Sequence, residues 1–101
     1  MPTLFLAAWT LACSADAPAL PPEAERGRVV YAANCTSCHN ADPAKPGSLG
    51  PEVKGASREL LEARVVRAEY PVGYAAKRPS TMMRPLPKLA GEIDALAAYL
   101  R

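Results

Sequence analysis

With 101 residues, the chain has room for one domain built around a single small core. Its formal net charge of +2 is too close to zero to indicate nucleic-acid binding, so we expect no nucleic-acid partner. Eleven prolines interrupt regular structure, and a small, loop-rich domain of this kind usually needs a disulfide, a metal or a cofactor to stabilise it.

The chain begins with an uncharged, mostly apolar run at residues 3–12, which is too short to span a bilayer. This run leads into a Leu-Ala-Cys sequence that ends at Cys13 and is similar to the lipobox of bacterial lipoproteins. Residues 1–12 are therefore predicted to be a lipoprotein-like signal peptide, with Cys13 as the lipidated residue that anchors the protein to a membrane. Two features depart from that pattern, because no Lys or Arg precedes the run and Thr10 stands where Leu is usual.

Plain secretion is the main alternative, with cleavage after an Ala-Asp-Ala pattern that ends at Ala17, although Pro18 directly follows that bond. An uncleaved anchor or an incorrectly assigned start also remains open. Lipidation and secretion both predict a periplasmic or other extracytoplasmic location. Residues 13–22 are then expected to be a flexible tether, and residues 23–101 the folded domain.

The first predicted helix covers residues 23–34. Two prolines precede it, and Glu23 and Glu25 in its first turn complement the helix dipole. Gly27 is unusual here, because a glycine inside a helix costs about 1 kcal/mol relative to alanine. We therefore expect a packing reason for Gly27.

Cys35, Cys38 and His39 form a C-x-x-C-H sequence, which is an attachment motif for c-type haem. Two thiols on one turn can each bond a vinyl group of the porphyrin, and the next residue then places an imidazole under the iron. A structural zinc site needs four ligands, whereas this chain has one histidine and its third cysteine lies in the signal region. A thioredoxin-like dithiol needs a βαβ setting, for which the sequence has no convincing strand pattern. One covalently attached haem c is favoured over both, with His39 as the proximal axial ligand.

Residues 39–55 are rich in Pro, Gly, Ala and Asn and are predicted to form a loop around the proximal side of the haem. A further helix is predicted over residues 57–69, with Ser57 as its N-cap and an imperfect apolar stripe. Arg64 and Arg67 are expected to lie on the solvated face of this helix.

The closing helix is predicted over residues 93–100, where apolar residues recur with the spacing i, i+3, i+4 and i+7. We expect Leu96 and Tyr99 to cross the first helix near Gly27 and Tyr31. That crossing would close the two ends of the chain over one edge of the haem.

From residue 23 to residue 101 the chain resembles the class I cytochrome c family. Beyond the haem motif, the resemblance rests on Gly27 and Tyr31, on Gly50-Pro51 in a G-P-x-x-x-G stretch that ends at Gly55, on Met83-Arg84-Pro85-Leu86-Pro87, and on the A-Y-L ending of the closing helix. It implies an all-α fold, with three principal helices and loops wrapped around one covalently attached haem.

The resemblance also implies roles for individual residues. Close approach of the closing helix would explain Gly27, and the Pro51 carbonyl would accept the second ring N–H of His39. The proline-rich loop and its likeness to the Met-Pro-Pro segment of the family favour Met83 as the distal axial ligand, with Met82 as the alternative. Arg84 stands where that segment usually has a proline.

Ligation of the iron by histidine and methionine implies a single-electron carrier rather than an enzyme, because no coordination position stays open for a substrate. We expect it to act in a respiratory or related extracytoplasmic electron-transfer chain. The alternatives are a haem-based module that binds or senses a small ligand and an electron-entry subunit of a larger oxidoreductase.

The expected partners are redox proteins. The proline-rich loop between Tyr74 and Leu89, called the methionine loop below, is basic. No acidic residue occurs from position 72 to position 91, so this region could steer the protein toward an acidic docking surface. Its basic residues are Lys77, Arg78, Arg84 and Lys88. A merely solvated loop, or charge that balances the haem propionates, is the alternative. A monomer is assumed, because no spare apolar face is evident.

Overall fold

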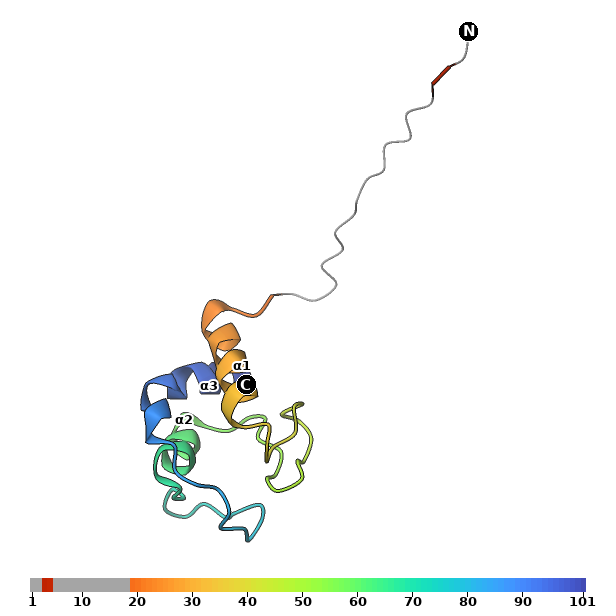
Figure 1. The fold of residues 1–101 in the computed structure, drawn as a ribbon. Helices are drawn as coiled ribbons and strands as arrows, with labels where there is room; N and C mark the ends of the chain where they lie inside the picture. Colours follow the sequence, from red (N-terminus) through yellow and green to blue (C-terminus); the bar gives the residue numbers. More distant parts are fainter. Residues whose placement is uncertain (1–2, 5–18) are drawn as a thin grey trace.

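The computed structural model describes residues 3–4 and 19–101 of the chain (Figure 1). The helical segments of this part are α1 (Pro22–Asn34), α2 (Arg58–Leu61), the π-helical turn η1 (Glu62–Val66), the 3-10 helix η2 (Pro87–Glu92) and α3 (Ile93–Leu100). The described residues contain no strand, which confirms the all-α prediction. None of their helices has the length and apolar character needed to cross a membrane. Cys13, nearly all of the expected signal peptide and most of the expected tether lie outside the described residues.

Helix α1 begins at Pro22, one residue before the predicted start. Proline suits the first turn of a helix because its missing N–H would have no intrahelical partner there. No side chain caps this end, and Glu23 and Glu25 lie in the first turn as expected. The helix ends where the Cys35 N–H donates to the Tyr31 carbonyl, so the haem motif directly follows its last turn.

Helices α1 and α3 pack against each other, and Gly27 makes their close approach possible (Figure 1). A Cβ atom placed on Gly27 would lie 2.6 Å from the Ala95 carbonyl carbon and 2.8 Å from Tyr99 Cβ, well inside normal contact. The rings of Tyr31 and Tyr99 meet with their centroids 5.6 Å apart. The predicted crossing is thus present, with one correction: Ala95, rather than Leu96, faces Gly27 together with Tyr99.

The helix predicted over residues 57–69 is shorter than expected. Ser57 is its N-cap, because its hydroxyl accepts a hydrogen bond of 3.1 Å from the Leu60 N–H. Within this segment only α2 is α-helical. The helix then widens into the π-helical turn η1, which ends at Val66. Ala68 then adopts a left-handed conformation with φ 54°, which turns the chain away from the helix axis.

The core lies where α1, α2, η1, η2 and α3 meet. Its buried side chains are Val30, Tyr31, Leu61, Val65, Leu89, Ile93, Leu96 and Leu100. The long loops before α2 and before η2 lie to one side of this helical layer (Figure 1). Residues of these two loops, which carry the haem motif and the methionines, line one cavity together with core residues.

Candidate functional site

The two cysteines of the motif lie on one turn after α1. The N–H groups of Cys38 and His39 both donate to the Cys35 carbonyl, over 3.3 and 2.9 Å. Both thiols are free, and both residues line the same cavity. Burial, and to a lesser degree Cys38, raises the pKa of the Cys35 thiol to about 11, so this thiol is neutral at pH 7. The turn thus presents two thiol sulfur atoms to one cavity.

The His39 imidazole is oriented by the loop that follows it. Its Nδ1 atom lies 2.8 Å from the Pro51 carbonyl oxygen. Because a carbonyl oxygen can only accept, this contact fixes the proton on Nδ1 and leaves the Nε2 lone pair free for a metal. The contact that the resemblance implies between these two residues is therefore present.

Two glycines allow the proximal loop to approach the motif. A Cβ atom on Gly50 would lie 2.5 Å from His39 Nδ1, so only a glycine lets the loop pass against the flat ring. A Cβ atom on Gly47 would lie 2.6 Å from His39 Cα. Gly50 belongs to a motif of the sequence, but the sequence analysis assigned no packing role to it. Gly47 was not identified, because nothing in the sequence distinguishes it except its position in a Pro- and Gly-rich loop.

Backbone hydrogen bonds hold this proximal loop on the motif. The N–H groups of Leu49 and Gly50 donate to the Cys38 carbonyl over 3.2 and 3.0 Å, and the Gly47 N–H donates to the Gly50 carbonyl over 2.8 Å. From the other side, the Tyr31 hydroxyl donates to the Asn40 carbonyl. Burial, chiefly, raises the pKa of Tyr31 to about 12, so the hydroxyl keeps its proton and its donor role.

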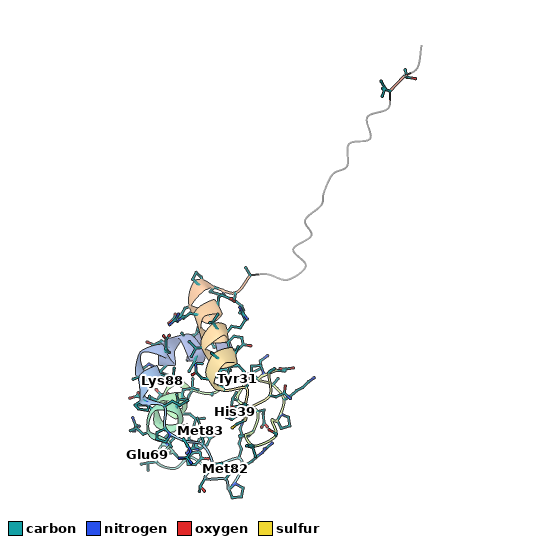
Figure 2. The ribbon with its side chains drawn as sticks, viewed as in Figure 1. Tyr31, His39, Glu69, Met82, Met83 and Lys88 are labelled. Carbon is teal, nitrogen blue, oxygen red and sulfur yellow. The ribbon has the colours of Figure 1, made fainter. Side chains whose placement is uncertain are left out.

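The two methionines differ in burial, although both line the cavity. Met83 is half-buried and packs against the hydrophobic core, whereas Met82 is 63% exposed. Figure 2 labels both side chains together with His39. Three residues after Met83, the Leu86 N–H donates to the Val65 carbonyl over 2.6 Å, which ties the methionine loop to the end of η1.

The cavity between these two loops has a volume of about 690 Å³. This lies in the range of cofactor and ligand sites, which are concave and mostly apolar. Its apolar wall includes Val53, Leu61, Val65, Leu86, Leu96 and Leu100. A large, mostly apolar cavity that is lined by two thiols, an oriented imidazole and a thioether fits a covalently attached haem.

Arg64 corrects one sequence-based expectation. It was predicted to be solvated, but it is half-buried, lines the cavity and lies over the Tyr70 ring, 4.1 Å from the ring centroid. The Tyr70 ring stacks on Tyr74 with the centroids 5.6 Å apart, and both tyrosines line the cavity, a role the sequence analysis missed. Arg67 is exposed as expected and pairs with the carboxylates of Glu62 and Glu69.

Two of the four basic residues in and next to the methionine loop make polar contacts with another loop of the same chain. Lys77 Nζ lies 3.3 Å from Glu52 Oε1, and Arg78 donates to the Gly47 carbonyl over 3.1 Å. The pKa of Glu52 is lowered by its own backbone N–H and by Lys77. Within the described part of the chain, Arg84 and Lys88 have no ion pair.

Comparison with known protein families supports this interpretation. The model of the family described as "Cytochrome c" matches residues 24–101. Searches of curated proteins and of solved structures returned no match. Proteins of this family carry covalently attached haem c and transfer electrons, typically outside the cytoplasm. The chain belongs to the cytochrome c family.

Proposed function

We propose that this protein is a single-electron carrier in which His39 and Met83 ligate the iron of one haem. The observation that carries the proposal is the oriented imidazole of His39 on the same cavity as the half-buried thioether of Met83. When bound, the haem supplies an iron that alternates between the ferrous and ferric states. The chain itself holds, orients and shields this iron.

Attachment is assigned to Cys35 and Cys38, whose sulfur atoms would form two thioether bonds. His39 would bind through Nε2, while the Pro51 carbonyl holds its ring in place from the other nitrogen. Such support keeps the ligand geometry constant, so little rearrangement accompanies electron transfer.

Met83 is preferred to Met82 because of its packing. A ligand inside a protein needs a side chain that is already held near the site, and Met83 packs against the core while Met82 is 63% exposed. A thioether ligand raises the haem potential relative to a second histidine, which suits a carrier. With both axial positions filled by protein, no position stays open for a substrate.

We also propose an extracytoplasmic location, with Cys13 as the site of lipid attachment and with acidic redox proteins as partners. The family supports the location in general terms. For docking, Arg84 in the methionine loop and Lys88 in η2 are basic side chains that carry no ion pair within the described residues. A monomer in a respiratory or related chain is the working assumption.

The test is carbon monoxide binding to the reduced holoprotein, produced in a host that attaches haem c. A six-coordinate carrier keeps its reduced absorption spectrum when carbon monoxide is added. A spectrum that shifts at low carbon monoxide concentration would instead support a haem-based ligand-binding module and contradict the carrier proposal. Stoichiometric copurification with a catalytic subunit would assign the protein to a larger oxidoreductase.

A further inference from the structure

The loop that carries the methionines is joined to the loop that supports His39 by two consecutive basic residues. Lys77 Nζ donates to the Glu52 carbonyl over 3.0 Å and pairs with the carboxylate of the same residue over 3.3 Å. Arg78 donates to the Gly47 carbonyl over 3.1 Å, in a partly buried position. Both basic residues, and Glu52 as well, line the cavity. The two contacts therefore connect the loop that carries the methionines with the loop that supports His39 on the wall of one cavity.

The acceptors of these bonds are parts of the support for His39. Glu52 directly follows Pro51, whose carbonyl contacts the imidazole. Gly47 packs against the backbone of His39 so closely that a Cβ atom there would overlap with it. A displacement of Glu52 would therefore move the neighbouring Pro51 carbonyl that contacts the His39 ring, and a displacement of Gly47 would move the backbone of His39 directly.

The donors lie on the chain shortly before the distal ligand. Between Arg78 and Met83 the chain has no helix, and after Met83 its next backbone attachment is the bond from the Leu86 N–H to the Val65 carbonyl. Met83 thus lies on a span that is fixed at both ends. Release of the first end would leave this span held by the bond at Leu86 and by the packing of Met83 against the core.

We propose that Lys77 and Arg78 form a latch that holds the methionine loop against the proximal loop and so keeps Met83 on the iron. They are positioning residues, since neither is assigned to the iron itself. The inference rests on the proposed ligation by His39 and Met83. On this proposal, the main role of the charges of Lys77 and Arg78 is to stabilise the contact between the two loops, and not to bind a partner protein.

Imidazole binding to the ferric holoprotein measures this latch, because added imidazole binds only when Met83 has left the iron. Its apparent affinity is proportional to the fraction of molecules in that open state. We expect Lys77→Leu to raise the affinity about three-fold, since its ion pair is exposed. Arg78→Leu should raise it about ten-fold, since a charged hydrogen bond in a partly buried place is stronger. The control is Lys45→Leu, which removes the same charge from the proximal loop outside the latch and should change the affinity less than about two-fold.

Amide hydrogen exchange separates a loosened loop from a destabilised protein. The latch predicts faster exchange of the Leu86 N–H, which donates to the Val65 carbonyl, in the Lys77→Leu/Arg78→Leu double variant, with α1 and α3 unchanged. Faster exchange throughout the protein would show a general loss of stability and overturn the latch.

Met83→Ala separates failure of the latch from failure of the ligation. If Met83→Ala binds imidazole far more tightly than the parent while the double variant matches the parent, the latch is wrong and the ligation stands. If Met83→Ala binds imidazole no more tightly than the parent, the ligation by Met83 is wrong, and the latch is overturned with it.

Discussion

Substitution of Gly27 by alanine tests the crossing of α1 and α3, on which the closed form of the domain depends. The added Cβ atom would lie 2.6 Å from the Ala95 carbonyl carbon, 2.8 Å from Tyr99 Cβ and closer still to the Ala95 oxygen. Carbon atoms in contact normally lie about 3.5–4.0 Å apart, so the two helices must separate by about 1 Å. The obstacle is a backbone carbonyl in a packed helix pair, and it cannot rotate away as a side chain would.

The size of the effect follows from two opposing terms. Overpacking of an interior site costs about 1–3 kcal/mol, and a clash with backbone belongs at the upper end of that range. Replacement of glycine by alanine inside a helix stabilises the helix by about 1 kcal/mol, which opposes this cost. The free energy of unfolding should therefore fall by about 2 kcal/mol, which lowers the Tm of a domain of this size by about 8–16 °C.

Thermal melting of the holoprotein, followed by circular dichroism, is the assay. Gly91→Ala is the matched control, because no atom lies within 4 Å of a Cβ at that position, and it should melt within a few degrees of the parent. A Gly27→Ala variant that melts at or above the temperature of the parent would refute the close approach of α1 and α3 as a constraint on this residue.

Three further outcomes are expected. Gly50→Ala should lower the yield of holoprotein and disturb the His39 ligand field, because its Cβ would lie 2.5 Å from Nδ1; an unchanged visible spectrum at full yield would contradict this packing. Ala68→Gly should raise the free energy of unfolding by about 0.5–1 kcal/mol, since relief of the left-handed strain at φ 54° exceeds the entropy that glycine adds to the unfolded chain, and an unaltered or lower melting temperature would count against it. The pKa of Glu52 lies below the ordinary 4.5 because of its own backbone N–H and then Lys77, and the pKa of Glu92 lies below it because of Arg26. The contribution of these groups to stability is present above the ordinary value and is lost as the pH falls through the lowered pKa values, so melting at pH 7, 5, 4 and 3 should show no loss from them until below about pH 5.

The parts of the site that the sequence predicts are those that follow from local patterns. Two thiols and an imidazole with fixed spacing must share one turn, and α3 has the bounds that its apolar spacing predicts. Proline and two acidic residues likewise mark the start of α1 within one residue. In each case, neighbours in the sequence determine the structure.

The parts that could not be predicted depend on contacts between distant loops or on a change of helical period. Arg64 lies in η1, where the wider π-helical turn rotates side chains away from the positions that a 3.6-residue period assigns to them. Gly47 matters only because the loop returns onto His39. The partners of Lys77 and Arg78 lie 25 and 31 residues away, and no local pattern identifies them.

The reduction potential of the matched variants Met82→Ala and Met83→Ala tests the central claim most directly. Loss of a thioether ligand lowers the haem potential, because the thioether favours ferrous iron. We expect Met83→Ala to have a potential far below that of the parent and Met82→Ala to match the parent. A lowered potential in Met82→Ala alone, or an unchanged potential in both variants, would contradict the assignment of Met83 as the distal ligand.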